Sequence, residues 1–147
     1  MKKVLKKSMS ILLAFTLLFG SLEFGFSDVD WSGLAVKAEA TTYSGTCGEN
    51  LTWTLNTETG ELVISGTGHM YGWNYSSKAP WYNNRSSIKH VTIGNGVTSI
   101  GKYAFYKYTN LTGVTISNSV TDIDYGAFRY TSLTSITIPD SVARVNM

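Results

Sequence analysis

A repeat of 22 to 23 residues is the feature of this sequence that most constrains its fold. Residues 88–93, Ile-Lys-His-Val-Thr-Ile, return as Leu-Thr-Gly-Val-Thr-Ile at 111–116 and as Leu-Thr-Ser-Ile-Thr-Ile at 133–138. Between residues 86–105 and 109–128 nine of 20 aligned positions are identical, where unrelated segments would share about one or two. Repeats of this period are typical of architectures in which one small structural unit stacks on the next.

Each repeat predicts one coil of a solenoid. In Val114-Thr-Ile116 the two outer side chains share one face of a strand and the threonine faces the other. A polar pair such as Asn95-Gly96 then turns the chain. A second apolar pair follows, and Gly-x-x-Ala-Phe at 101–105 predicts a bent or short helical corner. A lone coil would leave both flat faces in water, so stacked neighbours are needed to complete the burial.

The solenoid is predicted over three units, 86–108, 109–130 and 131–147, of which the last is incomplete because it lacks its own Ala-Phe step. The segment before it, 41–85, has a different pattern. Leu51-Thr-Trp-Thr-Leu55 and Leu62-Val-Ile64 alternate as in a β-hairpin. Five aromatic residues of this segment lie within twelve residues around Pro80. Since the open end of a repeat stack needs a cover, we predict that 41–85 forms an N-terminal hairpin and aromatic cap.

The first forty residues predict a secretory signal peptide. Lysines 2, 3, 6 and 7 precede an apolar run from Ile11 to Phe19, and Ala38-Glu-Ala40 supplies small residues for cleavage after Ala38 or Ala40. The run is too short to span a bilayer, which takes about 20 apolar residues. We therefore expect contact with a membrane only through this signal, and a secreted or surface-displayed mature chain beginning near Thr41.

The unit Leu-x-x-Val-x-Ile-x-x-x-Val-x-x-Ile-x-x-x-Ala-Phe resembles the BspA-type leucine-rich repeat of bacterial surface proteins. The segment from Cys47 to Gly68, with Ala79-Pro-Trp-Tyr82, is similar to the region that often precedes such repeats. The resemblance implies a β-rich, right-handed leucine-rich-repeat solenoid of short parallel strands, secretion, and an adhesive or interaction role. The chain departs from the family pattern at Tyr108 and Tyr130, which stand where that family often has cysteine.

Two groups of residues are candidate ligand contacts. Tryptophan and tyrosine rings stack on sugars and anchor protein interfaces, although the same rings can fill a cap. The outward strand positions form a flat, hydroxyl-rich column that suits broad, weak contacts. The candidates are Trp73, Tyr75, Trp81, Tyr82, His90, Thr92, Thr115 and Thr137.

The sequence predicts neither catalysis nor a cofactor or metal site. The one cysteine, Cys47, has no helix start beside it to activate the thiol. Two isolated histidines and scattered acids give no metal-ligand cluster. The acidic pairs, Glu58 with Glu61 and Asp122 with Asp124, lie on predicted turns or edges rather than in a cleft. With a net charge of +2, no nucleic-acid partner is indicated.

These observations favour a non-catalytic, adhesion-type module that contacts host or cell-surface proteins or glycans. An alternative is a structural spacer, or the N-terminal fragment of a larger surface protein, because the third unit stops before its Ala-Phe step. A secreted hydrolase ranks third. An uncovered last coil would also favour self-association through its strand edge.

Overall fold

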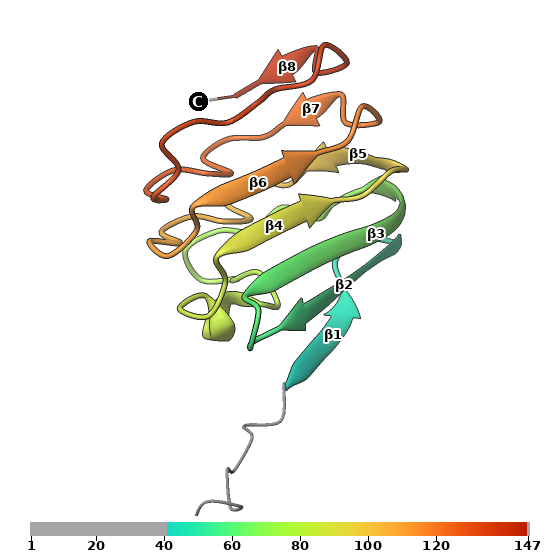
Figure 1. Ribbon diagram of the computed structural model, residues 1–147. Helices are drawn as coiled ribbons and strands as arrows, with labels where there is room; N and C mark the ends of the chain where they lie inside the picture. The colour runs from blue at the N-terminus through green and yellow to red at the C-terminus, as the bar shows by residue number, and fades with distance from the viewer. Residues whose placement is uncertain (1–40, 147) are drawn as a thin grey trace, which may run out of the picture. The chain divides into compact units, whose positions relative to one another are not determined.

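The computed structural model describes residues 41–146, which contain eight β-strands and a short 3₁₀ helix, η2 (Tyr82–Asn84) (Figure 1). The predicted signal peptide lies outside the described residues. Within residues 41–146 there is no helix of the length and apolarity that crossing a membrane requires. The strands are β1 (Thr42–Thr46), β2 (Asn50–Asn56), β3 (Glu61–His69), β4 (His90–Ile93), β5 (Val97–Ile100), β6 (Gly113–Ile116), β7 (Asp122–Ile123) and β8 (Arg144–Val145).

Strands β1, β2 and β3 form an antiparallel meander that precedes the repeats. In β2 every second residue is buried, and these are Leu51, Trp53 and Leu55. Trp53 lies opposite Ile64 of β3, which is also buried. The alternation visible in the sequence therefore directs one face of the β2–β3 pair into the core.

Strand β3 joins the meander to both sheets of the repeat region. Its first half pairs in parallel with β4, where Leu62 lies beside Val91. Its end pairs with β5, where Gly68 lies beside Val97 and the register shifts. Gly66 has a φ of 110° at this bend, a conformation that side chains with a Cβ rarely adopt. A single strand thus turns a corner and contributes to two sheets.

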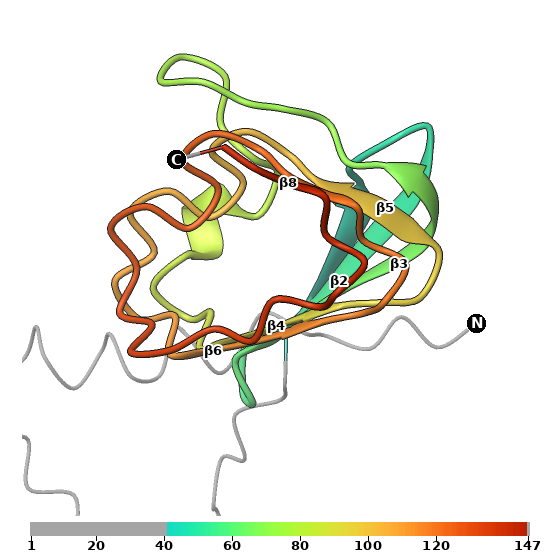
Figure 2. The same ribbon diagram turned by 90° about the horizontal axis from the view of Figure 1, so that it is seen from above.

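Equivalent strands of successive repeats pair in parallel and in register. Val91 of β4 lies beside Val114 of β6, and Ile100 of β5 lies beside Ile123 of β7. Viewed along the stack, the coils superpose, with β4 and β6 along one side and β5 and β8 along another (Figure 2). The predicted alignment of the apolar columns between the first two units is confirmed.

Burial decreases from the first coil to the third. Val91 and Ile93 are buried in β4, their equivalents in β6 are half-buried, and Ile138 in the third unit is 38% exposed. Residues 133–138 repeat the strand sequence but form no strand, and in the third unit only β8 pairs with its neighbour. Within the described residues, the third coil packs against another coil on one side only, so the same sequence pattern gains less burial there.

Candidate functional site

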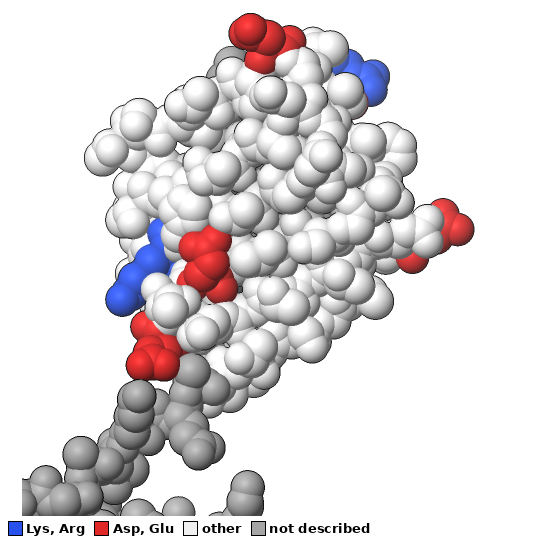
Figure 3. Space-filling view, turned by 45° about the vertical axis from the view of Figure 1, so that its right-hand side comes forward, with Lys and Arg blue, Asp and Glu red and all other residues white. Residues whose placement is uncertain are grey.

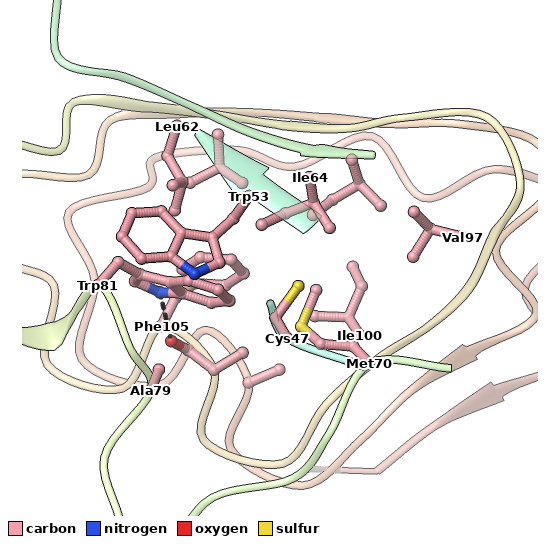
Figure 4. Close-up of a cluster of buried hydrophobic side chains, with 14 of the residues drawn as sticks. Cys47, Trp53, Leu62, Ile64, Met70, Ala79, Trp81, Val97, Ile100 and Phe105 are labelled. Carbon is pink, nitrogen blue, oxygen red and sulfur yellow. Dashed lines mark hydrogen bonds between the residues drawn. The ribbon is translucent and has the colours of Figure 1, made fainter. Parts of the chain in front are cut away.

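The two tryptophans among the candidate ligand contacts lie in the core. Trp81 is fully buried, and its indole N–H donates to the carbonyl oxygen of Ala104 at 3.2 Å (Figure 4). Trp73 is 9% exposed and packs edge-on against Trp81, with ring centroids 5.3 Å apart. Trp53 contacts Trp81 edge-on, and Phe105 stacks on it. Trp73 and Trp81 therefore fill space between the N-terminal segment and the first coil, and a dissolved ligand does not reach Trp81.

A second aromatic cluster lies nearer the surface, and two of its rings are exposed while three are half-buried. We call it the tyrosine ridge and define it as Tyr75, Tyr103, Tyr106, Tyr125 and Tyr130. Tyr75 lies 5.3 Å from Tyr103 and 5.6 Å from Tyr106, measured between ring centroids. Tyr103 and Tyr106 are 5.2 Å apart. Tyr125 extends the ridge from Tyr103, and Tyr130 extends it from Tyr106, each at 5.5 Å. Of the predicted contacts, Tyr75 belongs to this ridge.

The ridge exists because the corners of the first two repeats stack. The main-chain N–H of Tyr103 donates to the carbonyl of Tyr125, and that of Phe105 donates to Ala127. Phe105 and Phe128 stack on the inner side with rings almost parallel, at 5.3 Å. Ala104, Phe105 and Ala127 are buried, whereas the tyrosines of the ridge that flank these steps are half-buried or exposed.

Tyr75 reaches the ridge from a different part of the chain. It belongs to the loop that joins β3 to η2, which extends beyond the outline of the coils (Figure 2). Asn74 closes a tight turn there, with its side-chain oxygen accepting from the main-chain N–H groups of Ser76 and Ser77. At 61% exposure, Tyr75 is the most exposed ring of the ridge.

Cationic side chains lie over the rings of the ridge and of neighbouring Tyr82. A cation over an aromatic face is attracted by the negative charge of the π-system. Arg85 lies 4.3 Å from the centroid of Tyr82, and Arg129 lies 4.9 Å from that of Tyr130. The same arrangement joins Lys78 to Tyr75 and Tyr82, Lys102 to Tyr103 and Tyr125, and Lys107 to Tyr106.

The rings of Tyr75, Tyr103 and Tyr106 contact one another in the middle of the ridge. The pKa of Tyr75 is lowered, first by its side-chain hydrogen bond with Tyr106 and then by that with Tyr103. The same bond raises the pKa of Tyr106 to about 12, because donating it stabilises the protonated form. Beside them, the depression lined by Trp73, Lys78 and Tyr82 has a volume of about 10 Å³, room for one water molecule. A ligand of the ridge would therefore lie across it rather than inside a pocket.

Three of the predicted outward strand residues, His90, Thr92 and Thr115, form a polar cluster with Glu61. The sequence analysis did not name Glu61 as a binding residue. Glu61 lies opposite His90 in the β3–β4 pair, and its carboxylate contacts His90 Nδ1 at 2.9 Å. The hydroxyl of Thr92 donates to the other carboxylate oxygen at 2.5 Å. His90 Nε2 lies 3.4 Å from the hydroxyl of Thr115. Thr137 is exposed in the third unit, where residues 133–138 form no strand, and within the described residues no hydrogen bond joins it to this cluster.

A carboxylate that contacts a histidine, which in turn contacts a hydroxyl, is also the arrangement of a nucleophilic triad. Such a site needs free N–H donors that stabilise the oxyanion. Here the strands that carry His90 and Thr115 pair in a parallel ladder. Figure 3 shows a face of the molecule on which charged residues are few and scattered. The cluster fits a flat polar contact surface better than a reaction centre.

The structure also places the other residues considered for catalysis or metal binding, Cys47 and His69. Cys47 is buried, and burial raises the pKa of its thiol to about 12. His69 lies 3.2 Å from the hydroxyl of Thr98. In the part of the chain that the structure describes, no group of three or more His, Cys, Asp or Glu residues is placed to hold a metal ion.

Sequence reasoning missed Tyr103, Tyr106, Tyr125 and Tyr130 as surface residues. A signal was present, because each tyrosine lies within three residues of an Ala-Phe step. Tyr108 and Tyr130, which the sequence analysis treated alike, differ in environment: Tyr108 is buried and Tyr130 is 55% exposed. A register of 23 residues places Thr131, and not Tyr130, at the position equivalent to Tyr108.

Comparison with known proteins matches the repeat region to a family. Residues 76–147 match the BspA-type leucine-rich repeat region, in six copies. A crystal structure of a leucine-rich repeat protein from Eubacterium ventriosum ATCC 27560 is similar, with 35% sequence identity and a TM-score of 0.66. The similarity covers 71% of this chain and 28% of that protein, so this chain spans little more than a quarter of its length. No curated protein matches the sequence.

Proposed function

Because residues 76–147 belong to the BspA-type leucine-rich repeat family, a repeat suited to protein interaction, we propose that this chain is an extracellular, non-catalytic binding module of the adhesion type. Its partners would be proteins or glycans of host or other cell surfaces. The matched family and the bacterial neighbour support an interaction role. The basic start, apolar run and Ala38-Glu-Ala40 of the first forty residues support secretion.

The proposal assigns different roles to two parts of the chain. Residues 41–85 would cap a right-handed solenoid, and the coils from residue 86 would carry the binding surface. In support, β3 pairs with the first strands of the repeats, and Trp81 and Trp53 pack onto the first coil through Phe105 and each other. These contacts bury apolar surface that the first coil would otherwise expose to water.

The observation that carries the proposal is the tyrosine ridge. Tyrosine is enriched at interfaces because its ring buries a large area while its hydroxyl still forms hydrogen bonds. Five tyrosines contact one another on the outside of the molecule, and Tyr75 and Tyr130 are more than half exposed. A fold that needed these rings only for stability would bury them, as it buries Tyr108.

A binding screen of the mature protein against matrix proteins and glycans tests the proposal. We expect at least one partner whose binding is lost in the double variant Tyr103→Ala/Tyr106→Ala. Tyr43→Ala is the control, because Tyr43 is 41% exposed but lies on β1, outside the ridge. Binding that is equally sensitive to both variants, or no binding to any partner at high concentration, would contradict the proposal.

A structural role is the second candidate. The end face of the third unit is apolar around a hollow of about 460 Å³ lined by residues that include Phe128, Ile138 and Val145. We propose that this face promotes self-association, as uncovered coil edges do. In a spacer or a fragment of a larger surface protein, the same face would pack against further repeats.

A further inference from the structure

We propose that the tyrosine ridge binds an acidic polysaccharide, whose carboxylate or sulfate groups contact the ammonium and guanidinium groups that lie over the rings. This inference rests on the proposed function, since it names the class of partner for the same surface.

The ridge carries most of the positive charge of the described chain. Between residues 41 and 146 there are seven Lys and Arg residues. Five of them lie over tyrosine rings of the ridge or over Tyr82. Among the described residues, ion pairs join Glu61 to His90 and Asp122 to Arg144, so neither involves these five cations. Uncompensated cations on one surface attract anions.

Three of these cations come from two stacked corners rather than from a single coil. The corners of the two coils stack through the hydrogen bond from the N–H of Lys107 to the carbonyl of Arg129. Neighbouring strands in such a stack are about 4.8 Å apart. Lys102 and Lys107 come from the first corner and Arg129 from the second. Because the depression beside Tyr75 holds one water molecule at most, cations on adjacent corners suit a polymer that lies across the ridge and carries charges at intervals.

The rings favour sugars over nucleic acids. Proteins that bind single-stranded nucleic acids offer aromatic faces on which bases stack. Here the edge of one ring contacts the face of the next, with an interplanar angle of 85° between Tyr75 and Tyr106, and cations lie over ring faces. The exposed groups of the ridge are hydroxyls that donate and accept hydrogen bonds, beside cations. Sugar hydroxyls and carboxylates complement both.

The test measures binding of the full chain to four polymers of different chemistry: alginate, dextran sulfate, uncharged dextran and poly-glutamate. We expect binding to alginate or dextran sulfate, none to dextran, and weaker binding to poly-glutamate. The variant Lys102→Gln/Lys107→Gln should weaken polysaccharide binding about tenfold and lower the slope of log K against log salt by about one for each lysine removed. The variant Tyr103→Ala/Tyr106→Ala should also weaken it.

The matched control is Lys89→Gln/Arg144→Gln, which removes the same two charges outside the ridge. Equal losses in both charge variants, or poly-glutamate binding as tight as polysaccharide binding, would overturn the inference. So would tight binding of an oligothymidylate in the same assay. If no anionic polymer binds while a neutral glycan or a protein still requires Tyr103 and Tyr106, this inference fails and the proposed function stands. If the full screen finds no ridge-dependent partner, both fail.

Discussion

Gly101 and Asp124 occupy equivalent positions in successive repeats, and the structure shows why the first is glycine. A Cβ at Gly101 would lie 1.8 Å from the carbonyl oxygen of Tyr71, in the segment that precedes the repeats. Asp124 lies one coil further along, where its main-chain N–H donates to Ile100. The departure of the second copy from the first therefore reflects what each position packs against, and not a weakening of the repeat.

This difference gives a prediction at the residue scale. Gly101→Ala should destabilise the protein by about 1–3 kcal/mol, as overpacking of a close backbone contact does. Gly72→Ala is the control, because its nearest neighbour would be the Cβ of Lys102 at 3.3 Å, a milder contact. Urea unfolding measures both. Equal stabilities of the two variants would show that the contact with Tyr71 is not rigid.

At the scale of elements, the segment between β3 and β4 holds the meander and the first coil together. It forms no strand, and η2 is its one short helix, so its main contribution is side-chain packing. Trp81 stacks on Phe105 at 5.6 Å and contacts Trp53 edge-on at 5.7 Å. Through Trp81, a residue of the first corner and a residue of β2 share one cluster (Figure 4).

Trp81→Ala should therefore lower the free energy of unfolding by about 3–5 kcal/mol, the usual cost of removing a buried tryptophan. The removal leaves a cavity and also leaves the carbonyl of Ala104 without its indole partner. Differential scanning calorimetry should show a clearly lower Tm. Tyr71→Ala, at a residue that is 55% exposed, should change it little. An unchanged Tm for Trp81→Ala would refute a capping role for this segment.

The strands differ in how well the sequence predicts them. The alternation of β2 and the repeated strands β4 and β6 could be predicted because each buries one face, which leaves a period in the sequence. Strand β1 was not predicted, since Thr42–Thr46 buries little and is held by pairing with β2. The third strand at 133–138 was predicted and is not formed. Its sequence has the period, but within the described residues no further coil packs on the end face of the third unit.

At the scale of the whole described molecule, the burial of apolar side chains decreases along the stack from the first coil to the third. The first coil lies between the meander and the second coil, and Val97, Ile100 and Phe105 are fully buried. On the third coil, Ile138 and Val145 are 38% and 47% exposed beside the apolar hollow. Exposed apolar surface next to an unpaired strand favours contact with another chain.

We expect the 147-residue chain to self-associate with rising concentration. Ile138→Glu should reduce this association, because it places a charge on the apolar face. Thr137→Glu adds the same charge at the adjacent exposed position and should leave association unchanged. Sedimentation velocity over a range of concentrations measures the effect. A monomer at every concentration, or equal effects of the two variants, would contradict the prediction.

The sequence by itself determined the coil, its period and its inward face, because these depend on residues that are neighbours along one strand or one corner. Val91 and Ile93 lie on the same face whatever the rest of the chain does. The tertiary structure alone decided the surfaces. Tyr75 meets Tyr106, and Glu61 meets His90, only after β3 and the coils pair in one register. Contacts between residues about 30 positions apart leave no local period, so the ridge and the polar cluster become visible only in the folded chain.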